Sequence, residues 1–303
     1  MGHQHGSGGH TSTRTRLVVA LSITVGVLVV EAIGAWLSGS LALLADAGHM
    51  ASDAIGLAVA LVASMIALRP PTDRHTFGFR RVEVLAALVN GLLLVGLAIT
   101  ISIEGIRRLV EGSAEPLAVP MLIVAAIGLL ANLVVLGVLI GGDRSSINLR
   151  GAILEVLGDA LGSLAAIIAA VIILLTGFHA ADAIASLLVA VLILPRAVVL
   201  LRDVVRVLTE SAPPGTDVAE IRAHLLGTAG VVDVHDIHVW AITSGSPVFS
   251  AHVVVEPGVL EREGAADLLR RLDTCLHEHF DVGHSTFQLE PVGYADDESH
   301  THA

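Results

Sequence analysis

Six long apolar stretches follow one another along the first two thirds of the chain. A helix needs about 20 predominantly apolar residues to cross the hydrocarbon core of a bilayer, and each stretch is long enough to do so. Short segments rich in Gly, Pro and Ser separate the stretches, as is typical of turns between helices. The pattern therefore predicts six transmembrane helices, at residues 17–37, 41–67, 83–106, 117–140, 151–175 and 183–205.

The last third of the chain has a different pattern. Amphipathic segments at residues 217–227 and 263–280 predict two helices. Shorter runs of apolar and β-branched residues at 231–242, 248–255 and 286–289 predict strands. The order helix, strand, strand, helix, strand indicates a small α+β domain.

These patterns divide the chain into a six-helix transmembrane domain at residues 14–208 and an α+β domain at residues 209–293. The tails at residues 1–13 and 294–303 are polar and carry several His. We expect both tails to be disordered, because they contain few side chains that a core could bury.

Composition and charge agree with a membrane protein. Of 303 residues, 54% are hydrophobic and only 15% are charged, and mean hydropathy is +0.79. The net charge of −12 comes from residues 209–303, where 4 Arg stand against 16 Asp and Glu. This negative charge argues against binding to nucleic acid, whose phosphates need basic partners. The single cysteine, Cys275, excludes a disulfide framework and a four-cysteine metal site.

The Arg residues predict the orientation in the membrane. The chain has no Lys, and most loop Arg lie in segments that share one side of the membrane with both termini. Arg107 and Arg108 lie on the opposite side. Because basic loops stay in the cytoplasm, we expect a multi-pass protein of the cell membrane, with both termini and the acidic domain inside the cell.

Two of the apolar stretches contain pairs of metal-binding side chains. His49 and Asp53 lie in the second stretch, and Glu155 and Asp159 lie in the fifth. Both pairs have i,i+4 spacing, which places the two side chains on one face of a helix. Packing the two faces together would surround one point with four N and O ligands, the number that Zn²⁺ prefers. The alternative is a structural network of hydrogen bonds between helices.

Two further acidic residues have less specific interpretations. Asp46 lies one turn before His49 and is expected either to orient that His or to line the path of the cation. Asp182 lies at the start of the sixth stretch, where we expect it to be the N-cap of its own helix.

Four motifs resemble those of the cation diffusion facilitator family, and the likeness extends over residues 15–292. They are Ser38 to Asp53 (SGSLALLADAGHMASD), Gly158 to Ser163 (GDALGS), Thr76 to Glu83 (TFGFRRVE) and Val234 to Trp240 (VHDIHVW). The chain is most similar to the bacterial zinc, cadmium and cobalt exporters. The resemblance implies a homodimeric antiporter in the lipid bilayer that exports divalent metal ions, above all Zn²⁺, in exchange for protons. It also implies a cytoplasmic domain with a ferredoxin-like, metallochaperone-like fold.

The chain departs from this family at Glu155, where the zinc branch usually has His. Three carboxylates and one imidazole would carry a formal charge of −3. Three carboxylates a few ångströms apart in a medium of low dielectric constant cannot all stay ionised, so we expect the metal-free site to hold a proton. Metal binding would expel that proton, which couples the two ions. A harder site also leaves Co²⁺, Cd²⁺ and Mn²⁺ open as alternative substrates.

The resemblance also implies metal sites outside the membrane. In the α+β domain it indicates His235, His252 and Glu290, with His284 nearby, as ligands for regulatory Zn²⁺. The alternatives are His238, His277 and His279, or histidines that are simply exposed on an acidic surface. In the loop between the second and third stretches, His75 corresponds to one ligand of a family site. Its partner positions, Thr72 and Phe79, are poor ligands, although Asp73 could assist.

The sequence does not favour an enzyme. An intramembrane hydrolase would need motifs such as H-E-x-x-H or G-x-S-x-G, and the chain contains neither. A membrane metal sensor that binds without transport is the remaining alternative. We therefore expect a secondary active transporter.

Overall fold

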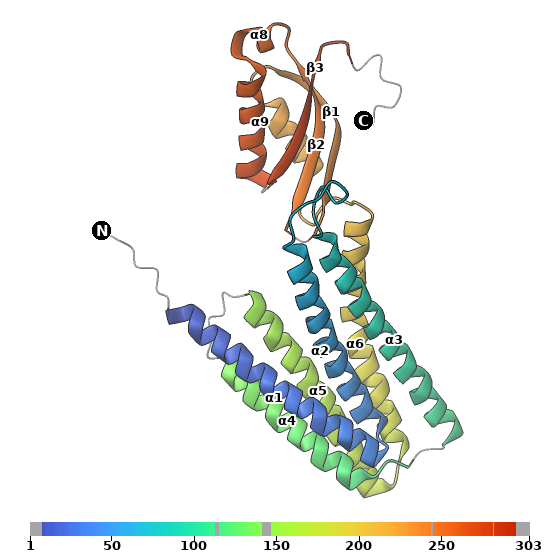
Figure 1. Cartoon of the computed structure of the whole chain (residues 1–303). Coiled ribbons are helices and arrows are strands. Elements are labelled where there is room, and N and C mark those ends of the chain that lie inside the picture. Colours follow the sequence, from blue (N-terminus) through green and yellow to red (C-terminus); the bar gives the residue numbers. More distant parts are fainter. Residues whose placement is uncertain (1–7, 113–114, 141–146, 244, 281, 295–303) are drawn as a thin grey trace. The chain divides into compact units, whose positions relative to one another are not determined.

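The computed structural model describes residues 8–112, 115–140, 147–243, 245–280 and 282–294. Six of the described helices are long and apolar enough to cross a membrane, which confirms the predicted transmembrane architecture (Figure 1). They are α1 Gly8–Ser38, α2 Leu41–Ala67, α3 Arg81–Glu111, α4 Ala118–Ile140, α5 Ile147–Thr176 and α6 Ala180–Leu208.

Several helices are longer than the apolar stretches that predicted them. Helix α1 begins at Gly8, so the expected disordered tail at residues 1–13 overlaps its first turns. Adding a turn to an existing helix costs far less than starting a new one, which allows a membrane helix to extend into polar sequence. The rest of that tail, at residues 1–7, and residues 295–303 of the other tail lie outside the described residues.

The chain forms two compact units. The helical unit comprises residues 1–59 and 88–201, and the C-terminal unit comprises residues 60–87 and 202–303. The second unit therefore includes the ends of α2 and α3 and their connection, as well as the α+β domain.

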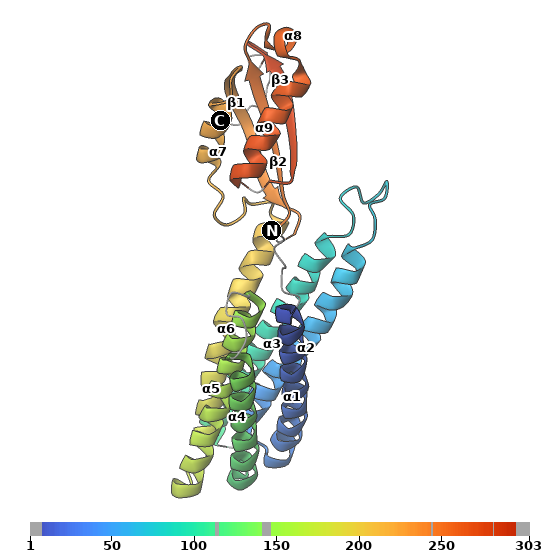
Figure 2. The same ribbon diagram turned by 90° about the vertical axis from the view of Figure 1, so that its left-hand side faces the viewer.

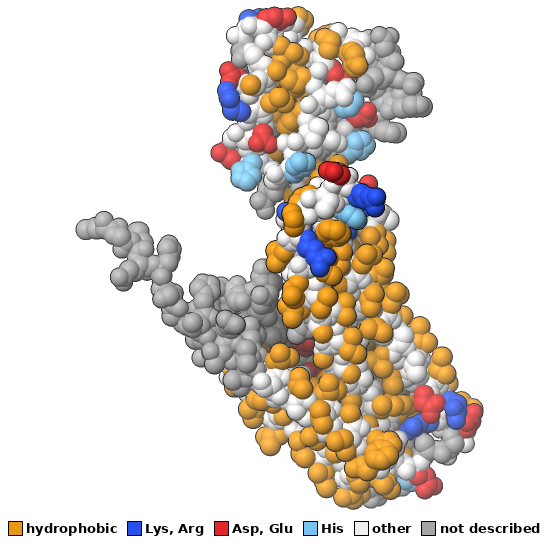
Figure 3. Space-filling model, in the orientation of Figure 1, with side chains coloured by type: hydrophobic (Ala, Val, Ile, Leu, Met, Phe, Trp, Pro, Cys, Tyr) orange, Lys and Arg blue, Asp and Glu red, His pale blue; other side chains and the backbone are white. Residues whose placement is uncertain are grey.

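Small side chains allow the helices of the helical unit to pack closely. One cluster of buried residues is dominated by Ala and joins α1, α2, α4, α5 and α6, and a second joins α2, α3 and α6. Close approach of backbones through small residues is the usual way that membrane helices associate. Large apolar side chains cover the outer surface of these helices (Figure 3), as a bilayer requires.

Asp182 caps a different helix from the one that we predicted. Its carboxylate accepts hydrogen bonds from Ser40 Oγ at 2.6 Å, Leu41 N at 2.7 Å and Ala42 N at 3.1 Å, at the start of α2. The expected N-cap of α6 is therefore wrong. The free backbone N–H groups of α2 lie beside the start of α6, and the carboxylate satisfies them there. Through Asp182, α6 fixes the beginning of the helix that carries His49.

The α+β domain has the predicted order of elements (Figure 2). The elements are α7 Val218–Leu226, β1 Val231–Ala241, β2 Pro247–Val255, α8 Val259–Glu263, α9 Ala265–Phe280 and β3 His284–Pro291. In the sheet, β2 lies in the centre, antiparallel to β1 and parallel to β3. This order is that of a ferredoxin-like fold, βαββαβ, without its first strand.

The core of the α+β domain lies on one face of the sheet. Buried side chains of α7 and α9 pack there against alternate residues of β2, including Phe249, Ala251 and Val253. The second predicted helix, at residues 263–280, corresponds to α9, and the short helix α8 before it was not predicted. Gly264, whose φ is +81°, ends α8 before α9 begins. Since side chains alternate along a strand, the residues between those of the core point to the opposite face.

Candidate metal centres

The helical unit contains a cluster of the predicted ligands. His49 Nε2 lies 3.6 Å from Asp53 Oδ2, one turn further along α2, and 4.0 Å from Asp159 Oδ1 of α5. His49 is 8% exposed and Asp159 is 3% exposed. The structure thus brings together side chains from the two helices that the i,i+4 spacings indicated.

In the part of the chain that the structure describes, two buried atoms of this cluster lack a hydrogen-bond partner. Among the described residues, neither His49 Nδ1 nor Asp159 Oδ1 has a hydrogen-bond partner. Buried polar groups in folded proteins are rarely left unsatisfied, because they lose their hydration without compensation. An imidazole N and a carboxylate O are suitable ligands for a divalent cation.

Arg196 of α6 also belongs to this cluster, although the sequence analysis missed it. Its Nη1 lies 3.2 Å from Asp53 Oδ2, and its Nη2 lies 3.5 Å from Glu155 Oε1. Arg196 therefore joins one carboxylate of α2 to one of α5. The available signal was a cation inside an apolar helix, directly after Pro195. Charged residues within a membrane helix are functional candidates by default, so the position of this Arg could have been identified from the sequence.

Glu155 lies at the edge of the cluster. Its side chain is 39% exposed and pairs with Arg196. The four predicted ligands therefore do not form a complete coordination shell in this structure. Among the described residues, sets of three ligands whose atoms all lie within 4.8 Å of one another occur only in the C-terminal unit.

Asp46 of α2 forms a hydrogen bond with a residue of α5. It is 1% exposed and accepts a hydrogen bond from Ser163 Oγ at 3.3 Å. This hydrogen bond gives Asp46 a partner on α5, and its two expected roles, orienting His49 or lining the path of the cation, stay predictions. A Cβ at Gly162 would lie 2.6 Å from Asp46 Oδ1, so the glycine is needed for this close approach of α2 and α5. Gly162 and Ser163 both belong to the GDALGS motif, which by itself predicts no role for either residue.

The α+β domain contains a second set of predicted ligands. His235 of β1 pairs directly with His252 of β2, so their side chains lie on the same face of the sheet. Glu290 of β3 contacts both, with Oε2 3.4 Å from His235 Nε2 and Oε1 2.7 Å from His252 Nδ1. All three ligand atoms lie within 4.8 Å of one another. Of the alternative ligands, His238 and His277 belong to no such set among the described residues.

Two other predicted ligands lie elsewhere. His284 is six residues from Glu290 along β3, which corresponds to about 20 Å, and its ring packs edge-on against Phe77. The strand therefore keeps His284 away from the set that contains Glu290. His75 stacks on Phe79 with ring centroids 4.5 Å apart and belongs to neither of the three-ligand sets among the described residues.

Two family models match the chain. The model of the cation efflux transmembrane domain matches residues 17–209, and the model of the cation efflux protein, cytoplasmic domain, matches residues 213–292.

Full-length relatives are similar to the chain from end to end. The "Cadmium, cobalt and zinc/H(+)-K(+) antiporter" of Bacillus subtilis (strain 168) is 38% identical, over 100% of this chain and 94% of the relative. The "Zinc transporter ZitB" of Escherichia coli (strain K12) is 42% identical, over 96% of this chain and 93% of the relative. The solved structure "Metal-bound C-terminal domain of the CzcD transporter from Cuprividus metallidurans" is 37% identical, over 25% of this chain and 99% of that chain, with a TM-score of 0.23.

Proposed function

Because this chain belongs to the cation efflux family, in its zinc, cadmium and cobalt branch, we propose that it exports Zn²⁺ through a site formed by His49, Asp53, Glu155 and Asp159. Co²⁺, Cd²⁺ and Mn²⁺ are alternative substrates of the same site, since carboxylate ligands also suit harder cations. The protein is a multi-pass membrane protein, and this activity is that of a secondary transporter.

The observation that carries the proposal is the contact between His49 and two carboxylates, Asp53 and Asp159, from two helices. Buried charges in a membrane are costly and persist where they bind an ion or one another. A cation that draws in Glu155 as a fourth ligand has to displace Arg196, since this Arg contacts both Asp53 and Glu155. The site therefore exchanges one positively charged partner for another.

Proton exchange follows from the same donor set. The single positive charge of Arg196 compensates only one of the three carboxylates, so the other two repel each other unless a proton or a metal ion is present. Metal binding then releases a proton, and metal departure readmits one. A relative at 38% identity carries the word antiporter in its name, which supports this coupling.

Our proposal extends to regulation and assembly. Both termini lie in the cytoplasm, the chain is a homodimer, and His235, His252 and Glu290 bind regulatory Zn²⁺. The support is the compact arrangement of these three ligands, with room in a tetrahedral shell for one more.

The test is uptake of Zn²⁺ into proteoliposomes. We expect His49→Ala and Asp159→Asn each to reduce the initial rate to about a hundredth or less, because each removes a ligand of the transported ion. Asp203→Asn is the matched control, since this exposed carboxylate of α6 pairs only with its neighbour Arg206 in the described part of the chain. If the wild type binds Zn²⁺ without any flux, the protein is a metal sensor and not a transporter. Full flux in both site variants would show that these residues do not form the transport site.

A further inference from the structure

A third group of metal-binding side chains lies between two helices of the α+β domain. His224 comes from α7, and Cys275 and His279 come from α9. One ligand atom from each of the three residues lies within 4.8 Å of the other two. Cys275 is partly buried and both His are exposed, so the group is accessible from solvent.

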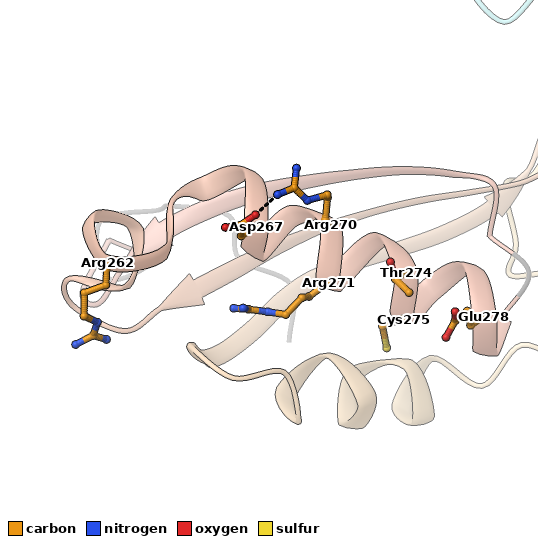
Figure 4. A pocket seen from close by; sticks show the side chains of 7 residues that line it. All are labelled: Arg262, Asp267, Arg270, Arg271, Thr274, Cys275 and Glu278. Carbon is orange, nitrogen blue, oxygen red and sulfur yellow. Dashed lines mark hydrogen bonds and ion pairs between the residues drawn. The ribbon is translucent and has the colours of Figure 1, made fainter.

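Helix geometry holds the group together. Cys275 and His279 have i,i+4 spacing and share one face of α9. Figure 4 shows the Cys275 side chain directed from α9 toward the neighbouring helix. Cys275 also lines an open pocket of ≈ 820 Å³, whose described lining residues include neither His224 nor His279. The ring of His224 approaches that of His279, with centroids 4.9 Å apart.

Contacts within α7 and α9 hold both His residues in position. In α7, the Asp217 side chain caps the first turn, and Ile221 and Leu225 are fully buried on either side of His224 in the sequence. In α9, the Nδ1 of His279 lies 3.1 Å from the carbonyl O of Cys275. A hydrogen bond from Nδ1 to that carbonyl leaves Nε2 as an acceptor, which is how metal-binding His residues are commonly oriented.

We propose that His224, Cys275 and His279 form an additional cation site, which binds Zn²⁺ and Cd²⁺. One thiolate and two imidazoles are three of the four ligands of a tetrahedral site, and a water molecule would take the fourth position. Ligand atoms around such a metal are about 3.5 Å apart, so small changes of side-chain rotamer within the observed 4.8 Å would close the shell.

This site differs in position and chemistry from the site at Glu290. It lies between the helices, whereas His235, His252 and Glu290 are held by the strands. It is also the softer of the two, because a thiolate replaces the carboxylate, and soft ligands favour Cd²⁺ over Co²⁺ and Mn²⁺. Bound metal would join α7 to α9. The proposal does not depend on the transport site.

The single cysteine allows a specific test in the full-length protein. Because Cys275 is the only cysteine of the chain, any thiolate-to-metal charge-transfer absorption after addition of Cd²⁺ or Co²⁺ reports on this residue alone. We expect the band to reach its maximum with one thiolate-bound Cd²⁺ per chain, once enough Cd²⁺ has been added to fill the other proposed sites as well. We also expect bound Cd²⁺ to slow alkylation of the thiol.

Three variants separate the site from a thiol that binds metal by itself. His224→Ala leaves the thiol in place and should weaken the Cd²⁺ affinity read from the band at least about tenfold, as the loss of a ligand requires. His277→Ala is the matched control, because this exposed His of α9 belongs to no three-ligand set among the described residues. His252→Ala should also leave the band unchanged.

The pH of the Cd²⁺ titration must allow the Cys275 thiol to lose its proton, because only the thiolate binds the metal. Partial burial and the neighbouring Glu278 carboxylate raise the pKa of the Cys275 thiol, so the titration is best made at mildly alkaline pH. Absence of the band in the wild type at saturating Cd²⁺ would overturn the proposal. A band of equal affinity in His224→Ala would overturn it as well, because the cation would then not bridge the two helices.

Discussion

At the scale of single residues, the proposed transport site contains a cation of the protein itself, Arg196, which would compete with the metal ion. Arg196 contacts Asp53 and Glu155 and carries a fixed positive charge. It therefore lowers the negative potential that a divalent ion would meet. In a partly buried site, a unit charge at about 4 Å interacts by a few kcal/mol.

We expect Arg196→Gln to lower the KM for Zn²⁺ transport at least about tenfold, which corresponds to roughly 1.4 kcal/mol. The substitution removes a positive charge beside two carboxylates and leaves their oxygens free to bind the ion. The measurement is initial Zn²⁺ uptake by proteoliposomes over a range of Zn²⁺ concentrations. Arg202→Gln, an exposed position six residues further along α6, should leave KM unchanged. An unaltered or higher KM in Arg196→Gln would mean that Arg196 does not oppose binding.

At the scale of the elements, periodicity predicted the features that are determined within a single helix or strand. The i,i+4 pairs in α2 and α5 and the strands β1 and β2 could be placed because their signals are local. The role of Asp182 could not, because its partners Ser40 and Leu41 belong to a helix about 140 residues away in the sequence. The Asp46–Ser163 contact escaped prediction for the same reason. Spacing identifies the face of a helix, but it does not identify which helix packs against that face.

The cap from Asp182 should be a main determinant of how α2 is placed. We expect Asp182→Ala to lower the free energy of unfolding by about 2 to 3 kcal/mol, because three donors at the start of α2 lose a charged acceptor in a buried place. Thermal or denaturant unfolding of the purified protein in detergent measures this change. Asp203→Ala, at an exposed position of the same helix, should change it by less than about 0.5 kcal/mol. Equal stability of the two variants would contradict the capping role.

At the scale of the whole molecule, the proposed metal sites of the two units differ in geometry. In the helical unit, the ligands are open and share their carboxylates with Arg196. In the C-terminal unit, the ligand atoms of each set already lie within 4.8 Å of one another. A site that must release its ion gains from a competing charge, whereas a site that senses the ion gains from a preformed shell. The geometry of each unit therefore supports the proposed division between transport and regulation.

The proposed exchange of metal for protons involves the whole transporter and can be tested with a pH gradient. Each pH unit supplies about 1.4 kcal/mol per proton that moves. Vesicles that are more acidic inside should therefore take up Zn²⁺ faster as protons leave, and a protonophore should abolish the increase. Glu155→Gln removes one group that can exchange a proton, so we expect most of the acceleration to be lost in this variant. Glu104→Gln, which replaces a carboxylate paired with Arg107 and Arg108 on α3, should keep it. If Glu155→Gln responds to the gradient as fully as the wild type, the proton is carried by another group, because the neutral amide introduced at this position has no proton to exchange.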